Sequence, residues 1–179
     1  MEKVCVYCGS SSGKQPEYGY AARRLAKALT LRGIGVVYGG ASVGIMGEIA
    51  DAVLAGGGEV IGVIPQALAD KEIAHEGLTE LKIVGSMHER KQEMMALSDG
   101  FIALPGGLGT QEELFEALTW SQLGIHKKPC GLLNVEGYYD KLCAFLDHAV
   151  EEQFVKTYHR EMLLVEDSPE KLLTLMETY

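Results

Sequence analysis

A glycine-rich run in the middle of the chain has the residue types and the spacing of an anion-binding loop. Gly106, Gly107 and Gly109 follow an apolar stretch that ends at a proline, and glycine adopts backbone conformations that a Cβ would forbid. Thr110 comes next and is a good N-cap for a helix over residues 111–123. The free N–H groups and partial positive charge of such a helix N-terminus would face the loop. The pattern therefore predicts a phosphate-binding loop.

Glu113 stands one turn into the same expected helix, and its residue type allows two roles. Thr110 and Glu113 have the spacing of a capping box, in which the glutamate side chain turns back to the N-cap N–H. Alternatively, the carboxylate lies close to the sugar attached to any phosphate that the loop holds. The spacing alone favours the capping box.

Arg90 and Lys91 form a second charged element, upstream of the glycine-rich run. They lie in the sequence Met-His-Glu-Arg-Lys at residues 87–91, within an expected helix over residues 86–97. A solvated charged helix face is the ordinary interpretation of such a pair. However, this helix immediately precedes the apolar strand that leads into the glycines, so its N-terminal half can also lie near the loop.

Together, the two elements resemble the paired signature of a known family. Pro-Gly-Gly-x-Gly-Thr-x-x-Glu at residues 105–113, preceded by the Arg-Lys pair, is similar to the signature of the LONELY GUY (LOG) family, the cytokinin riboside 5′-monophosphate phosphoribohydrolases. Further matches lie at residues 6–11, 38–47 and 62–65, so the resemblance covers nearly the whole chain. The family was long labelled as possible lysine decarboxylases, but nothing in this sequence resembles a pyridoxal phosphate site.

The resemblance implies an activity and a set of site residues. The activity is hydrolysis of the N-glycosidic bond of AMP or an N6-modified AMP (a cytokinin nucleotide), which releases free base and ribose 5-phosphate without a cofactor. Arg90 and Glu113 match the catalytic residues, which favours the catalytic role of Glu113 over the capping box. The remaining matches are to substrate-binding positions: Glu72, Lys91, Gly107, Leu108, Gly109, Thr110, Gln111, Glu112 and Thr119.

The resemblance also implies that the protein forms a homodimer. It further implies that the bound small molecule is a nucleoside monophosphate. Met87, Met94 and Met95 lie beside the Arg-Lys pair and are suited to an adaptable apolar surface near the site. Core packing within one subunit is the alternative role of these methionines.

A non-enzymatic nucleotide or cofactor carrier of the same fold is the alternative function. The glycine loops would suffice for a carrier without Arg90 and Glu113, and the fold does not decide between the two. Residues 9–15 are one residue short of a P-loop and lack Ser or Thr after the lysine, so no NTPase is implied. The expected first loop lacks Gly-x-Gly-x-x-Gly, and a mononucleotide therefore fits better than NAD.

The elements that position these residues alternate along the chain between apolar β-rich runs and helix-period segments. This alternation predicts an α/β, Rossmann-like, doubly wound parallel sheet in a single domain over residues 1–179. Ligands bind at the carboxyl ends of such strands, where the three glycine-rich loops, residues 9–13, 39–40 and 106–109, should line one crevice. Residues 65–79 show no clear periodicity and form either a lid or a plain connection. The expected strands are 4–7, 35–38, 59–64, 80–84, 101–104, 130–133 and 162–165, and the expected helices are 17–32, 44–55, 86–97, 111–123, 138–152 and 169–177.

Composition limits the other functions that the chain could have. The 179 residues carry a formal net charge of −9, which disfavours a surface for nucleic acid and therefore a DNA-processing role. The absence of a leader and of an apolar run of membrane-spanning length predicts a cytoplasmic protein without membrane contact. Cys5 and Cys8 form a Cys-x-x-Cys, but they lie in an expected strand, where residues three apart point to opposite faces. No second such pair is present and the five histidines lack ligand spacing, so no metal is expected.

Overall fold

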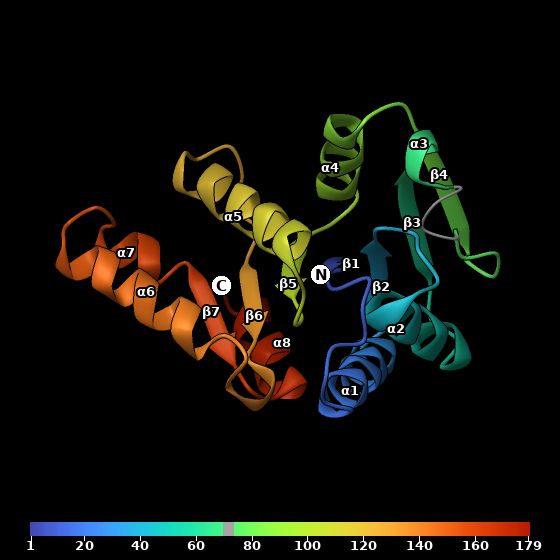
Figure 1. Cartoon of the computed structure of the whole chain (residues 1–179), viewed down its shortest axis with the longest axis horizontal. Helices are drawn as coiled ribbons and strands as arrows, with labels where there is room; N and C mark the ends of the chain where they lie inside the picture. Colours follow the sequence, from blue (N-terminus) through green and yellow to red (C-terminus); the bar gives the residue numbers. More distant parts are fainter. Residues whose placement is uncertain (70–73) are drawn as a thin grey trace.

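The computed structural model describes residues 1–69 and 74–179 and shows a seven-stranded parallel sheet with helices on both faces (Figure 1). The strand order is β4-β3-β2-β1-β5-β6-β7, and every neighbouring pair is parallel. This confirms the predicted doubly wound α/β fold. The strands are β1 (Lys3–Tyr7), β2 (Gly35–Tyr38), β3 (Val60–Pro65), β4 (Glu80–Val84), β5 (Gly100–Ala103), β6 (Cys130–Leu133) and β7 (Leu163–Glu166).

The central strands are apolar because helices cover them on both sides. β2, β5 and β6 are fully buried along their length, as expected for the interior of a parallel sheet. β4 lies at the edge, where its side chains are partly exposed and Glu80 and Lys82 form an ion pair with each other.

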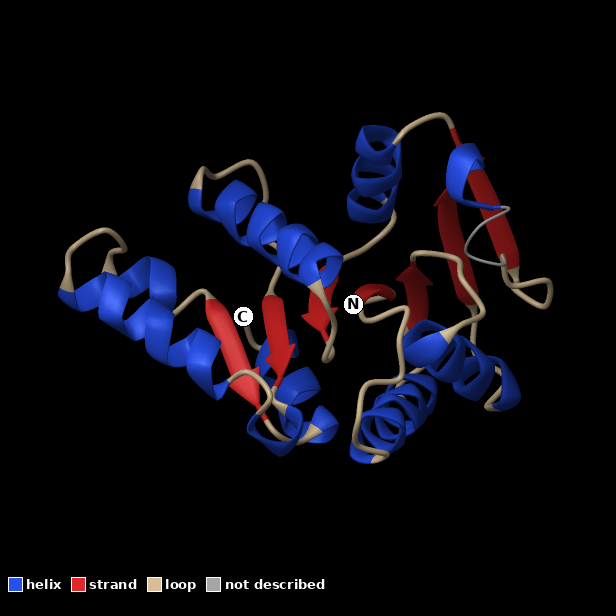
Figure 2. Ribbon diagram, viewed as in Figure 1, coloured by secondary structure: helices blue, strands red, loops and turns tan. Residues whose placement is uncertain are grey.

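The helices form two layers, one on each face of the sheet (Figure 2). Leu25 and Ile49 bury one layer against the sheet, and Met94 and Leu114 bury the other. No helix in the described part of the chain is long and apolar enough to cross a bilayer. The helices are α1 (Glu17–Leu31), α2 (Gly44–Ala55), α3 (Gln66–Ala69), α4 (Met87–Ala96), α5 (Leu108–Gln122), the 3-10 helix η1 (Val135–Gly137), α6 (Asp140–Glu151), α7 (Thr157–Arg160) and α8 (Pro169–Glu177).

The predicted elements are all present, and most of their bounds agree within about two residues. The short helices α3, η1 and α7 were not predicted. One difference affects the site: α5 begins at Leu108, three residues before the predicted start. In the expected lid segment, α3 follows β3 directly, and Ala74 pairs with Ala41 in an isolated antiparallel bridge.

The direction of winding reverses between β1 and β5, and this reversal creates the crevice. The chain after β1 leads to α1 on one face, whereas the chain after β5 leads to α5 on the other (Figure 1). The two loops touch, because the Gly9 N–H donates to the Pro105 carbonyl over 3.2 Å. The Met46 N–H donates to the Gly9 carbonyl at the same distance, so the first turn of α2, which follows β2, also contacts the loop after β1. This topological switch point is where ligands bind in open α/β sheets.

Candidate active site

A cavity of about 300 Å³ lies at the carboxyl ends of β1, β2 and β5. The loops after these strands contribute Gly9, Gly39 and Gly107 to its wall, and helices α4 and α5 contribute Arg90 and Glu113. The three glycine-rich loops therefore line one crevice, as the alternation of elements predicted. The structure also brings the two predicted catalytic residues to the same space.

Arg90 is buried, with 6% of its surface exposed, so the interpretation as a solvated charged face is wrong. Its Nε donates to the Val63 carbonyl over 3.0 Å, and its Nη2 donates to the Gly39 carbonyl over 2.9 Å. The first carbonyl lies within β3 and the second directly follows β2. Nη1 lies 3.8 Å from the Met87 sulfur, a weak acceptor. Because guanidinium stays protonated, the cavity wall carries a fixed positive charge.

Glu113 lies on α5, is partly buried and lines the cavity. Burial raises the pKa of its carboxyl from 4.5 to about 7, against the opposing effect of the nearby Arg90 charge. Within the described residues, the carboxylate of Glu113 accepts no hydrogen bond and forms no ion pair. It is therefore available to a ligand, and it changes charge near neutral pH.

The capping box predicted for Thr110 and Glu113 is not formed. Helix α5 starts at Leu108, with Gly107 as its N-cap in an extended conformation, so Thr110 lies inside the first turn and is 4% exposed. Glu113 then lies too far into the helix to reach an N-cap N–H. Gly107 is an N-cap without a side-chain hydrogen bond to the helix, so the helix begins directly after it.

The anion-binding geometry shifts with the helix start but is retained. The first helical bond given by the loop runs from the Gln111 N–H to the Gly107 carbonyl over 3.2 Å. The backbone N–H groups of Leu108, Gly109 and Thr110 precede this bond, and all three residues line the cavity. A Cβ on Gly106 would overlap the Thr110 hydroxyl, which explains the glycine at that position.

Lys91 lies beside the cavity but does not line it. Its ammonium donates to Glu112 Oε1 over 2.5 Å and to Glu116 Oε1 over 3.0 Å. Both carboxylates belong to α5, so Lys91 links α4 to α5. Hydrogen bonds to these two carboxylates raise the pKa of Lys91 against the opposing effect of burial. Glu112 reaches the cavity rim with one oxygen already paired.

Two residues in the first turn of α5 do not turn their side chains into the cavity: Gln111 turns toward Tyr139, and Leu108 is exposed at the rim. The Gln111 side chain points away from the cavity, and its Nε2 donates to the Tyr139 hydroxyl over 3.4 Å. Its buried Oε1 has no hydrogen-bond partner among the described residues. Leu108 is 91% exposed at the cavity rim, which is unusual for a leucine.

Thr119 does not join the cavity in this chain. It is exposed two turns beyond Glu113 and lines a separate cavity of about 200 Å³, together with Phe115 and Leu146. The position expected to contact substrate, Glu72, lies outside the described residues.

Several residues of the site have no clear signal in the sequence. Leu68 on α3 and Met87 on α4 give the cavity an apolar side. Tyr138 donates its hydroxyl to the Gly106 carbonyl over 2.6 Å and so holds the glycine loop from outside. Its position after β6, the strand next to β5, is the one feature that could have indicated it. Met94 and Met95 are buried in the core, whereas Met87 is 41% exposed.

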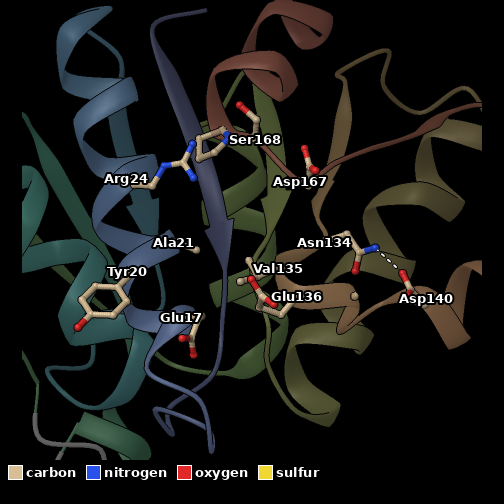
Figure 3. A pocket seen from close by; sticks show the side chains of 12 residues that line it. Glu17, Tyr20, Ala21, Arg24, Asn134, Val135, Glu136, Asp140, Asp167 and Ser168 are labelled. Carbon is tan, nitrogen blue, oxygen red and sulfur yellow. Dashed lines mark hydrogen bonds between the residues drawn. The ribbon is translucent and has the colours of Figure 1, made fainter.

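A larger cavity of about 710 Å³ lies between α1, η1 and the start of α8 (Figure 3). Carboxylates dominate it, including Glu17, Glu136 and Asp167, and its arginine, Arg24, is paired with Glu170 at 3.2 Å. None of the predicted site residues that the structure describes lines it. Across residues 1–69 and 74–179, no group of three or more His, Cys, Asp and Glu side chains is placed to hold a metal ion.

The fold and the cavity define a Rossmann-like α/β protein with a ligand site at its topological switch point. The model of a family described as "Possible lysine decarboxylase" matches residues 46–176. A protein of Oryza sativa subsp. japonica named "Probable cytokinin riboside 5'-monophosphate phosphoribohydrolase LOGL9" is 54% identical over 179 residues, covering 100% of this chain and 79% of its own. The Arabidopsis thaliana relative LOG7, named without "Probable", is 51% identical over 179 residues, or 82% of its length. The chain belongs to the LOG family.

Solved structures share the fold. A molybdenum cofactor binding protein from Rippkaea orientalis has a TM-score of 0.73 at 23% identity, covering 98% of this chain and 95% of its own. The molybdenum cofactor carrier protein from Chlamydomonas reinhardtii has a TM-score of 0.72 at 20% identity, covering 98% and 96%. At these identities the likeness concerns the fold alone.

Proposed function

We propose that this protein is a nucleoside 5′-monophosphate phosphoribohydrolase that acts on AMP or an N6-modified AMP. Water cleaves the bond between the base nitrogen and ribose C1′, which gives free base and ribose 5-phosphate. The main support for the proposal is that one cavity is lined by the buried Arg90, by Glu113, which takes no part in helix capping, and by the first-turn N–H groups of α5. The names of relatives at 51–54% identity support the same reaction.

The first turn of α5 is the proposed phosphate site. Gly107, Leu108, Gly109 and Thr110 bring backbone N–H groups and the positive end of the helix dipole to the cavity. These contacts require no basic surface, in keeping with the net charge of −9. The sugar attached to a phosphate held there would lie toward Glu113, which is further along the same helix.

Glu113 and Arg90 are the proposed catalytic residues. Departure of the base builds positive charge on the sugar ring, and a nearby carboxylate stabilises that charge or orients the attacking water. Glu113 has the ionised form for this role above a pKa of about 7. Arg90 adds a fixed positive charge to the wall of the same cavity, where it would meet the phosphate or the departing base.

The other residues predicted to contact the substrate are assigned different roles. Lys91 and Glu112 are engaged with each other, so we assign them to spacing α4 from α5 at the cavity rim. Gln111 is directed toward Tyr139 and would act by holding α5. The contribution of Glu72 rests on the family resemblance alone.

We propose a homodimer in which Thr119 completes the site of the partner subunit. The outer surface around α5 and α6 carries large exposed apolar side chains, which a second copy would cover. They include Leu108 at 91%, Leu123 at 66%, Phe145 at 63% and Phe154 at 89% exposure. Thr119 lies exposed on the same helix, away from its own cavity.

Subunit mixing tests the shared site. Glu113→Gln and Thr119→Arg should each be inactive as homodimers. Random reassociation of the two should restore about a quarter of wild-type activity, because half of the dimers are mixed and each mixed dimer has one intact site. A mixture that stays inactive while native mass spectrometry shows mixed dimers would place Thr119 outside the site.

One assay distinguishes the enzyme from the carrier that the fold also allows. The purified protein is incubated with AMP and with an N6-modified AMP, and free base is quantified by chromatography. Catalytic turnover that Glu113→Gln lacks supports the hydrolase, whereas stoichiometric binding without base release supports the carrier. The buried Arg90 and the ionisable Glu113 favour the hydrolase, because a carrier needs neither.

We also retain as proposals that residues 1–179 form one domain and that the protein acts in the cytoplasm. The single sheet supports the first. Limited proteolysis tests the domain, and imaging of a fluorescent fusion tests the location.

A further inference from the structure

Gly39 has no room for a side chain, and the neighbour that excludes one is the predicted catalytic arginine. A Cβ built on Gly39 would overlap Arg90 Nη2 and would lie 2.5 Å from Met46 Cε. The φ angle of Gly39 is outside the left-handed region, unlike that of the next residue, Gly40, at +82°. The glycine is therefore required for space and not for backbone conformation.

The missing side chain determines how Arg90 is held. Nη2 approaches the backbone at the end of β2 closely enough to donate to the Gly39 carbonyl, while Nε donates to the carbonyl of Val63 within β3. One edge of the guanidinium is thereby occupied by the protein. Nη1, beside the Met87 sulfur, is the end that keeps strong donors for a ligand.

We propose that Gly39 is a positioning residue, which admits the guanidinium of Arg90 against the end of β2 and directs Nη1 to the substrate. The catalytic part of this inference rests on the proposed hydrolase function. A side chain at residue 39 would overlap Nη2, so the guanidinium would have to shift away from its contact with the Gly39 carbonyl. A displacement of about 1 Å of a catalytic group reduces the rate about a hundredfold.

The kinetic test compares two glycine-to-alanine variants. Gly39→Ala should lower kcat about a hundredfold while KM changes less than threefold, because the loss falls on the orientation of a transition-state contact. Gly19→Ala is the matched control, since its Cβ would meet no atom closer than 3.5 Å and it lies on α1, away from the cavity. It should keep wild-type kcat and KM. A folded Gly39→Ala protein with near-normal kcat would overturn the proposal.

A thermal-unfolding cycle tests the contact without relying on activity. Gly39→Ala should lower Tm more in the wild-type background than in an Arg90→Ala background, where the guanidinium is absent. Equal losses in both backgrounds would show that Arg90 is not what occupies the space, and relief by Met46→Ala in place of Arg90→Ala would assign it to Met46. If Gly39→Ala alone does not fold, recovery of folding in the double variant with Arg90→Ala supports the proposal, and failure to recover contradicts it.

The two tests separate this inference from the proposed function. If the protein proves to have no hydrolase activity, the coupling between residues 39 and 90 in Tm should still be present. If the coupling is absent but the wild type is active, the hydrolase proposal stands and the role of Gly39 is wrong.

Discussion

Glu113 is the residue whose protonation links the chemistry of the site to the stability of the fold. Burial keeps its proton until the pH is near 7, whereas an ordinary glutamate loses it near 4.5. Catalysis needs the ionised form of Glu113, and ionisation of this buried carboxylate lowers the free energy of unfolding. Residues placed in such strained electrostatic surroundings are typical of active sites.

Activity should rise with pH through about 7, because only the ionised carboxylate of Glu113 stabilises the developing positive charge. The measurement is a profile of kcat/KM for AMP between pH 5 and 9. Glu113→Gln should lose about two orders of magnitude or more, and its residual rate should lack this rise. A wild-type profile that is flat between pH 6 and 8 would contradict the assigned role.

The same substitution should stabilise the protein at high pH. Between pH 4.5 and about 7 the unfolded chain releases the Glu113 proton while the folded protein keeps it, so wild-type stability falls across this window and then levels off. Glutamine avoids that loss, which amounts to about 3 kcal/mol at most. Glu113→Gln should therefore unfold at a higher temperature than wild type at pH 8, with little difference at pH 4.5. A capping glutamate would give the opposite sign at pH 8.

At the scale of elements, two tyrosines hold the loop between β5 and α5 by hydrogen bonds: the partly exposed Tyr138 and the buried Tyr139. The Tyr138 hydroxyl donates to the Gly106 carbonyl, and the buried Tyr139 hydroxyl donates to the Leu104 carbonyl over 2.7 Å. Both tyrosines follow β6, so the neighbouring strand fixes the position of the phosphate loop.

Tyr138→Phe should raise KM for AMP about fivefold with little change in Tm, because it frees the loop and removes a partly exposed hydrogen bond worth about 1 kcal/mol. Tyr139→Phe is the matched comparison. Its hydroxyl is buried, so its loss should lower Tm more than that of Tyr138. Equal effects of the two variants on KM and Tm would show that Tyr138 has no special role at the loop.

The N-terminus of α5 should make the 5′-phosphate decisive for turnover. Adenosine lacks the charge-assisted contacts to the first-turn N–H groups, so its kcat/KM should be about a hundredfold or more below that of AMP. The comparison uses adenosine, AMP and ATP at matched concentrations. Equal hydrolysis of adenosine and AMP would show that residues 107–110 do not hold the phosphate.

At the scale of the whole molecule, two apolar cores form on the faces of the sheet, and several large apolar side chains on and next to α5 and α6 stay exposed. A surface of this kind is costly for a monomer in water. Since Leu108 belongs both to this surface and to the cavity rim, assembly and substrate access would be coupled.

Light scattering at micromolar concentration should give about twice the chain mass of 19.4 kDa. Leu123→Glu places a charge on the exposed apolar surface and should shift the protein toward monomer with a parallel loss of activity. Leu31→Glu, on the exposed side of α1, is the control and should change neither. A wild-type monomer would rule out the proposed dimer.

The sequence by itself determined the strands, the long helices, the convergence of three glycine loops and the family, because apolar periodicity and loop motifs are local properties. Tertiary structure decided the burial of Arg90, whose carbonyl partners lie 27 and 51 residues away in the chain. It also decided that α5 starts at Leu108, that Glu113 is free of a cap, and that Thr119 faces away from the cavity of its own chain. These features depend on which helix packs beside the end of which strand. That packing determines which side chains lose contact with water and which hydrogen bonds they form, and the spacing of residues along the sequence does not specify it.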